Sequence, residues 1–326
     1  MNRSFQCKWN DVFGLWRVAS KKVAKSKSKS SIKLKRETKK PLSTLLRIAF
    51  LVGVCVSALP VMADTTWLGG EGNWNDATKW DAGVPTANDA AIIRSGTVTL
   101  NSTGAVADEL VVDGEFIING NGQLKVNLLS LSENGSSRFE VTGAKASLAV
   151  SKFFYFGHGC LSLNQGGKLT SASAAIYDGA SVEVMGSGSS WISSNVISIS
   201  TNAYITVRSG GSITADRFNM FGYTADQQAG VLNIGAPEGE TATAAGHVSG
   251  EIEFGENGGT LVLNHTDKDY VLASKIVTNN DYTGNGRINL LNGTTHFTGD
   301  LSGYKGEVNV KSRMLNIPML DAVTSR

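Results

Sequence analysis

Cysteine and charge are both scarce in this chain of 326 residues. Two of its three cysteines, Cys7 and Cys55, precede residue 64, so the rest of the chain holds Cys160 alone. One cysteine cannot form an intramolecular disulfide, which excludes a small disulfide-stapled fold. A chain that crosses a membrane pore unfolded would be selected to have few cysteines; the alternative is that the fold simply needs no disulfides.

The charge is low and unevenly distributed. Of the 30 Lys and Arg residues, 14 lie in residues 1–63, together with only two of the 28 acidic residues. The remainder carries 16 basic and 26 acidic residues, a net charge of −10, which argues against nucleic acid as a partner. With 41% hydrophobic residues and 37 Gly, this low charge favours an all-β, turn-rich domain.

Long hydrophobic runs are absent except at residues 42–59, which only Arg47 interrupts. This length is typical of the hydrophobic region of a signal peptide rather than of a full membrane span. Small residues follow, and we predict cleavage between Ala63 and Asp64, with an uncleaved membrane anchor as the alternative. The Lys/Ser-rich stretch before the run, read alone, would suit a nucleic-acid-binding tail. The hydrophobic run directly after it favours an export signal over residues 1–63.

Motifs for chemistry are also missing. No Gly-Asp-Ser-Gly or Gly-x-Ser-x-Gly sequence supplies a nucleophile, and the four widely separated histidines, His158, His247, His265 and His296, lack metal-ligand spacing. Carbohydrate-active β-helix proteins place charged side chains along one groove. The residues that could do so here are Asp178, Glu183, Arg208, Asp216 and Arg217. Scattered charges on solvated coils are the more ordinary interpretation, so we predict no enzyme activity, cofactor or metal.

After Asp64 the chain consists of short alternating apolar runs separated by Gly, Asn, Asp and Ser, and these runs repeat. The matching pairs, at offsets of 44, 43 and 45, are residues 161–170 with 205–214, 139–148 with 182–191, and 116–124 with 161–169. A unit of about 44 residues predicts two coils of a right-handed parallel β-helix whose inward Val, Ile and Leu side chains stack. A propeller blade is the alternative, but the uneven Gly-Gly and Asn-Gly turns favour the β-helix.

A tryptophan-rich segment opens this region. Trp67, Trp74 and Trp80 fall in residues 64–100, where we predict a cap that covers the first coil, followed by β-helix repeats over residues 101–326. Three closely spaced tryptophans could instead stack sugars in a carbohydrate site.

The first 25 residues resemble the extended signal-peptide region of type V secretion proteins. The matching residues are Met1, Asn2, Arg3, Trp9, Asn10, Trp16, Val18, Ala19 and Ser20. The resemblance implies targeting to the inner-membrane secretion machinery, and the basic stretch suits an anionic cytoplasmic leaflet.

The region after residue 64 resembles AIDA-type autotransporter passengers. The matching residues are Trp67, Gly69, Gly70, Trp74, Trp80, Gly83, Pro85 and Asp89, and the segments 230–248, 254–276 and 284–310 look like consecutive repeats of that family. Within them, residues 262–266 (VLNHT) depart from the family pattern by Leu for Phe, and His265 takes a structural role. The resemblance implies a non-enzymatic surface passenger that binds host-surface or bacterial-surface ligands, or itself, in adhesion, self-aggregation or biofilm formation.

Autotransporters end in a membrane barrel of roughly 250–300 residues. This sequence stops at Arg326 without barrel strands, so we expect a truncated product, a gene remnant or one piece of a split gene. It would be exported to the cell surface, or secreted, when joined to a translocator, and otherwise would stay in the periplasm. The alternatives are a carbohydrate-active β-helix enzyme or a two-partner secretion exoprotein, although the Asn-Pro-Asn-Gly motif of the latter is missing. A trimeric adhesin would need a heptad stalk, which is also missing.

Overall fold

The computed structural model describes residues 5–10, 15–20, 64–131, 137–281 and 286–311. The chain divides into two units at Ser57, and each is considered by itself. The described part of the first unit is an antiparallel hairpin of strands β1 (Phe5–Asn10) and β2 (Leu15–Ser20).

Three sequence predictions fall on residues that are not described. These are the hydrophobic run at residues 42–59, the cleavage residue Ala63 and the final residues 312–326. The export signal and the truncated end therefore stay predictions. In the described residues, no helix is long and apolar enough to cross a membrane.

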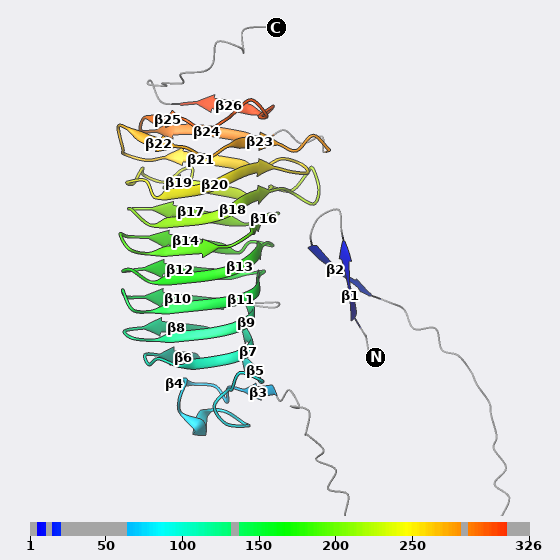
Figure 1. Cartoon of the computed structure of the whole chain (residues 1–326), viewed down its shortest axis with the longest axis vertical. Coiled ribbons are helices and arrows are strands. Elements are labelled where there is room, and N and C mark those ends of the chain that lie inside the picture. Colours follow the sequence, from blue (N-terminus) through cyan, green and yellow to red (C-terminus); the bar gives the residue numbers. More distant parts are fainter. Residues whose placement is uncertain (1–4, 11–14, 21–63, 132–136, 282–285, 312–326) are drawn as a thin grey trace, which may run out of the picture. The chain divides into compact units, whose positions relative to one another are not determined.

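The second unit is a stack of parallel strands (Figure 1). Its first sheet has eleven strands, each hydrogen-bonded to the strand one coil away. From one end to the other these are β4 (Glu71–Asn73), β6 (Thr97–Leu100), β8 (Glu115–Asn119), β10 (Ser137–Thr142), β12 (Gly159–Asn164), β14 (Ser181–Met185), β17 (Tyr204–Arg208), β19 (Val231–Gly235), β21 (Thr260–Asn264), β24 (Arg287–Asn292) and β26 (Glu307–Val310).

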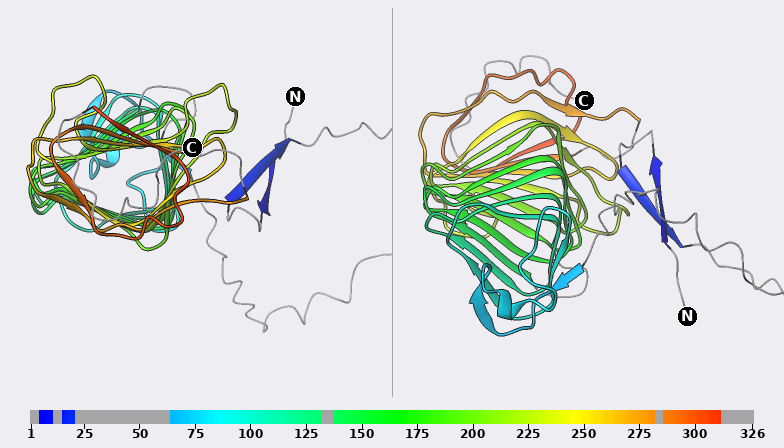
Figure 2. Two further views of the ribbon diagram at one scale, coloured as in Figure 1. Left: turned by 90° about the horizontal axis from the view of Figure 1, so that it is seen from above. Right: turned by 60° about the horizontal axis from the view of Figure 1, so that its bottom comes forward.

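A second sheet of eleven strands closes each coil. Its strands are β3 (Asp64–Thr66), β5 (Ala90–Ile93), β7 (Ala105–Val112), β9 (Gln123–Leu131), β11 (Ser147–Phe156), β13 (Lys168–Ile176), β15 (Ser190–Ser193), β16 (Val196–Ile199), β18 (Ser212–Met220), β20 (His247–Phe254) and β23 (Ile276–Thr278). Two further strands, β22 (Tyr270–Leu272) and β25 (Thr295–Phe297), pair with each other. Seen along the stack, the coils superimpose (Figure 2).

The predicted all-β parallel β-helix is therefore confirmed, and the propeller alternative is wrong because strands of successive coils stack in parallel instead of forming radial blades. The predicted two-coil repeat is also confirmed. Phe116 pairs with Phe139 and Phe139 with Leu161, so the offset of 45 spans two coils, and the same holds from Leu161 through Val182 to Ile205. These inward residues are buried and stack coil upon coil.

The long strands of the second sheet bend in the middle. In β13, Leu169 and Ser171 point inward, the next two residues both point outward, and Ala174 and Ile176 point inward again. Two consecutive outward residues break the alternation of a strand and produce a corner. β11 has the corresponding register shift between Val150 and Phe153. In β11 and β13 the chain therefore turns without a glycine at this corner, whereas β20 has Gly250 there, with a φ of +137°.

The repeated Gly-Gly pairs make the other corner possible. Gly166 and Gly210 adopt φ values of +91° and +80°, which L-residues with side chains seldom adopt. The second glycine of each pair packs on the preceding coil, since a Cβ on Gly167 would lie 2.0 Å from the carbonyl oxygen of Val141. The same contact recurs at Gly211, where the distance is 2.4 Å to a carbonyl oxygen. Close stacking of the coils thus explains the repeated pairs.

Candidate functional site

The three tryptophans singled out in the sequence are packed together at the β3 and β4 end of the stack. Trp67, Trp74 and Trp80 are at most 3% exposed. Trp80 lies edge-on to both of the others, at centroid distances of 5.2 and 5.1 Å, and Trp74 stacks on Phe116 at 5.5 Å. The Trp80 indole N–H donates to the Trp74 carbonyl oxygen at 2.8 Å. Buried rings offer no free face to a sugar, which argues against carbohydrate stacking here, and the capping role stays a prediction.

Asp64, predicted to follow the cleavage point, is the first residue of β3 and pairs with Ala90 of β5. The backbone from this residue onward belongs to the first coil. Cleavage between Ala63 and Asp64 itself stays a prediction.

The charged residues considered for a catalytic groove lie apart. Glu183 and Arg208 form an ion pair on the first sheet, with their Oε1 and Nε atoms 2.5 Å apart. Arg217 pairs instead with Glu251 and Glu253 on the second sheet. Asp178 lies in the turn before β14, and Asp216 lies in β18. The five residues therefore do not line one groove.

The histidines are likewise separate, and no group of three or more His, Cys, Asp or Glu side chains in the described residues could hold a metal ion. His265 is fully buried, its Nε2 atom lies 2.8 Å from the Thr295 hydroxyl, and its ring packs 5.1 Å from that of Tyr270. Burial lowers the pKa of His265, while the charge of Asp267 partly opposes the shift. Burial also raises the pKa of Tyr270 to about 12. These contacts place His265 in the packing between coils.

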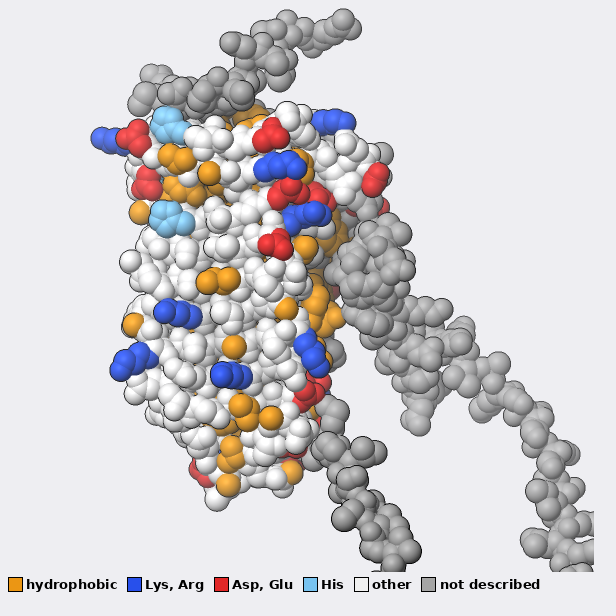
Figure 3. All heavy atoms as spheres, in the orientation of Figure 1, with side chains coloured by type: hydrophobic (Ala, Val, Ile, Leu, Met, Phe, Trp, Pro, Cys, Tyr) orange, Lys and Arg blue, Asp and Glu red, His pale blue; other side chains and the backbone are white. Residues whose placement is uncertain are grey.

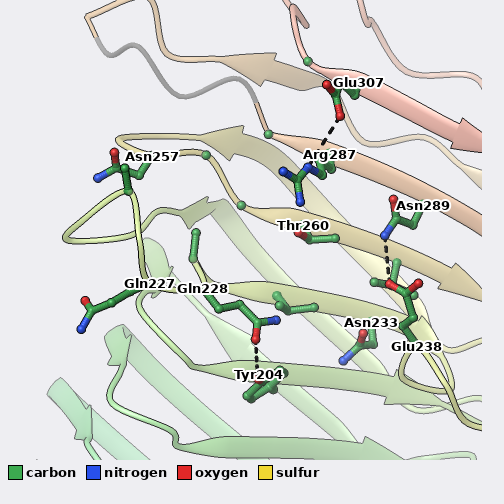
Figure 4. Close-up of a pocket in the computed structure, with 18 of the residues that line it drawn as sticks. Tyr204, Gln227, Gln228, Asn233, Glu238, Asn257, Thr260, Arg287, Asn289 and Glu307 are labelled. Atoms are coloured by element: carbon green, nitrogen blue, oxygen red, sulfur yellow. Dashed lines mark hydrogen bonds and ion pairs between the residues drawn. The ribbon is translucent and has the colours of Figure 1, made fainter.

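The feature best suited to a ligand is a groove of about 780 Å³ on the outer face of the first sheet, here called the polar groove (Figure 4). Two loops border it, residues 221–230 before β19 and residues 236–246 after it. Its floor consists of outward side chains on neighbouring strands from β17 to β26. In two adjacent columns these are Tyr204, Val231, Thr260, Arg287 and Glu307, and Asn233, Val262 and Asn289.

Hydrogen bonds hold the polar side chains of the groove in place. The Tyr204 hydroxyl donates to Gln228 Oε1 at 2.9 Å, which ties the first loop to the floor. On the opposite side, the Asn289 amide donates to Glu238 Oε2 at 3.1 Å and Lys311 Nζ donates to Glu238 Oε1 at 2.7 Å. Figure 4 shows Gln228 and Glu238 facing the strands from the two sides. Because these polar side chains are already held in place, a ligand does not have to order them when it binds, and the entropic cost of binding is lower.

The groove has nearly balanced charge. Its charged lining residues are Asp226, Glu238, Arg287, Lys305 and Glu307. The hydrogen bond and charge of Lys311, with a smaller contribution from Asn289, keep the pKa of Glu238 below its usual range despite some burial. A general acid for glycoside cleavage needs a raised pKa, so Glu238 is suited to accept hydrogen bonds from hydroxyl or amide groups and not to protonate a leaving group.

Sequence reasoning missed this groove. Strands of the first sheet follow one another at intervals of 21 to 23 residues between Glu115 and Tyr204, but the next intervals are 27 and 29 residues, to Val231 and Thr260. The extra residues form the two bordering loops. The longer interval between these repeats is therefore the sequence signal that could have located the groove, because insertions in a solenoid project from its turns.

Comparison with known proteins gives limited information. No protein-family model matches the chain, and no solved structure matches it. Over 160 residues, or 48% of its length, the chain is 31% identical to the uncharacterized protein YuaQ of Escherichia coli (strain K12). The matched region is 11% of that relative, so the chain spans a small part of its length.

Proposed function

We propose that this chain is a non-enzymatic ligand-binding β-helix of an autotransporter-type surface passenger, acting in adhesion, self-association or biofilm formation. The polar groove carries the proposal. It joins fixed amide, hydroxyl and carboxylate groups to a floor that includes the buried side chains of Val231 and Val262. Ligand sites commonly combine a partly apolar surface with a few placed polar groups.

The stacked coils support the same proposal in a second way. The floor side chains on β19, β21 and β24 stand on strands that are hydrogen-bonded to a strand on each side, so this part of the groove has a firm support. An extended repetitive face allows many weak contacts to add up through avidity. The resemblance to autotransporter passengers and the match to a small part of a much longer protein suit a passenger segment.

The first test is binding of the purified chain to glycans and to bacterial and epithelial cell surfaces. Gln228→Ala and Asn289→Ala remove one polar group from each side of the groove without touching the core. Asn119→Ala, on the same outer face but outside the groove, is the matched control. We expect weaker binding for the two groove variants and unchanged binding for the control.

Three outcomes would contradict the proposal. Equal binding by all variants would exclude the groove as the binding surface, and no binding to any of these surfaces would exclude the adhesive role. Release of new reducing ends from a bound polysaccharide would show an enzyme. Export is tested separately, by fractionating cells that express the chain from Met1 and measuring the mass of the product. A periplasmic or surface species that begins at Asp64 is expected, and an uncleaved cytoplasmic chain would refute export.

A further inference from the structure

A second concavity lies nearer the tryptophan end, where the first sheet turns into the second. It is a shallow, open cleft of about 670 Å³, here called the lysine cleft. It crosses several successive coils, and its lining is entirely polar apart from two alanines. The lining residues are Asn101, Ser102, Thr103, Asn121, Gln123, Ala144, Lys145, Ala146, Ser147 and Lys168.

The lysines of this cleft are not neutralised. Lys145 and Lys168 line it, and Lys125 lies beside it on β9; all three are exposed. Within the described ranges of the chain, no carboxylate forms an ion pair with any of them, and the cleft lining contains no acidic residue. In the orientation of Figure 3, separate Lys and Arg side chains stand on the lower left of the visible face, while more of the Asp and Glu side chains lie in its upper part.

Five cations of the opposite half are neutralised, whereas Lys268 and Lys305 have no ion pair among the described residues. Each of the following pairs with at least one glutamate: Arg208, Arg217, Lys275, Arg287 and Lys311. What distinguishes Lys125, Lys145 and Lys168 is that they gather at one cleft whose lining has no carboxylate, in a region with a net charge of −10. Their free charges are available to an anionic ligand.

Neutral hydrogen-bonding groups accompany these charges. The Asn101 side-chain oxygen accepts from Asn73 at 3.2 Å, and Asn101 is exposed, so its amide N–H groups are available as donors. Asn121 and Gln123 are exposed on the same cleft. The lysine ammonium groups can pair with negative charges of a ligand, and the amides beside them can bind hydroxyl groups that lie between those charges.

The lysines are spread along the stack in a way that suits an extended ligand. Lys125 pairs through Ala149 with Thr170, so it lies two coils from Lys168 and two residues to the side. With about 4.8 Å between strands and 3.3 Å per residue, their Cα atoms are about 12 Å apart. An extended acidic chain can contact both lysines at once and, between them, the amide groups of the cleft. Nucleic acid would meet repulsion from the acidic body outside the cleft, because its phosphates are dense and continuous.

We infer that the lysine cleft binds an acidic polysaccharide, with Lys125, Lys145 and Lys168 contacting its carboxylate or sulfate groups and the neighbouring amides contacting its hydroxyls. This inference rests on the proposed surface-binding function and names a ligand class for a second site on the same molecule. Such exposed ion pairs are weak singly and sensitive to salt. Binding therefore depends on several contacts along one chain.

The test measures binding of the full chain to two probes, a heparin oligosaccharide and an alginate oligosaccharide, in low salt and in about 0.5 M salt. Lys145→Gln/Lys168→Gln is compared with Lys152→Gln/Lys268→Gln, which makes the same charge change at exposed lysines outside the cleft. We expect a roughly tenfold loss of affinity for the first double variant and little change for the second. The two probes distinguish sulfate from carboxylate recognition.

Unchanged binding in the cleft variant, or an equal loss in both variants, would overturn the inference. So would equal or tighter binding of a single-stranded oligonucleotide, or retention of binding in high salt. The groove variants Gln228→Ala and Asn289→Ala separate the two proposals, because they should leave heparin and alginate binding intact. If the chain does not bind cells but binds the oligosaccharides through the lysines, the proposed adhesive function is refuted and the inference about the lysine cleft is supported.

Discussion

Replacing Trp74 with alanine should loosen one end of the β-helix while leaving the other end intact. Trp74 is fully buried, stacks on Phe116 of β8, two strands along the sheet from β4, and packs edge to face with Trp80. Deleting a buried tryptophan costs about 3–5 kcal/mol. Each aromatic contact adds about 0.5–1.5 kcal/mol beyond its buried area, which places Trp74→Ala near the upper end of that range.

The loss should stay local because each coil of a solenoid contacts only its neighbours. Hydrogen exchange followed by mass spectrometry should show faster exchange in β3 to β6 and unchanged protection in β18 to β21. Leu68→Ala, at a side chain that is 63% exposed in the same segment, is the control and should change the free energy of unfolding by no more than about 0.5 kcal/mol. Equal effects of the two substitutions, or a uniform loss of protection over all coils, would refute this reasoning.

Three other predictions concern stacking, pH and surface charge. Gly211→Ala should destabilise by about 1–3 kcal/mol, because its Cβ would overlap a carbonyl oxygen of the preceding coil. The loss should exceed that of Gly222→Ala, where φ is not positive and the nearest atom would be 3.3 Å from the Cβ; urea unfolding that ranks them in reverse would contradict this. Burial lowers the pKa of His265, so the unfolded chain binds the proton first and stability, complete above about pH 6.5, should fall below it. His265→Gln should flatten this dependence in urea titrations from pH 7.5 to 5.5, and His247→Gln should not. Glu183→Gln should cost no more than about 1 kcal/mol, and less in high salt, since its ion pair with a neighbouring arginine is partly exposed; a larger, salt-independent cost would contradict it.

The repeating part of the fold could be predicted from sequence because its determinants recur. The inward Phe, Leu, Val and Ile of successive coils follow the same alternation, and the offsets between Phe116, Leu161 and Ile205 count the coils correctly. The Gly-Gly pairs recur for a steric reason that is identical on each coil where they occur. Periodicity therefore gave the architecture without a detailed prediction of any single strand.

The sites were not predictable in the same way. Gln228 and Glu238 lie in loops that occur once each, and the second reaches Asn289, 51 residues away, only because an intervening coil turns between them. Lys125 and Lys168 are 43 residues apart and become neighbours through the stacking register. To predict which side chains meet across coils, one has to know the lengths of the turns, and these lengths vary from coil to coil.

Coil length varies along the stack, but the rise per coil does not. Coils of 18 residues, as from Thr97 to Glu115, and of 29 residues, as from Val231 to Thr260, advance the stack by the same single strand spacing of about 4.8 Å. The height of a binding group above the tryptophan end is therefore set by coil number, whereas its sideways reach is set by turn length. A peptide inserted at the exposed Gly239 turn would change the border of the polar groove without moving any side chain along the axis.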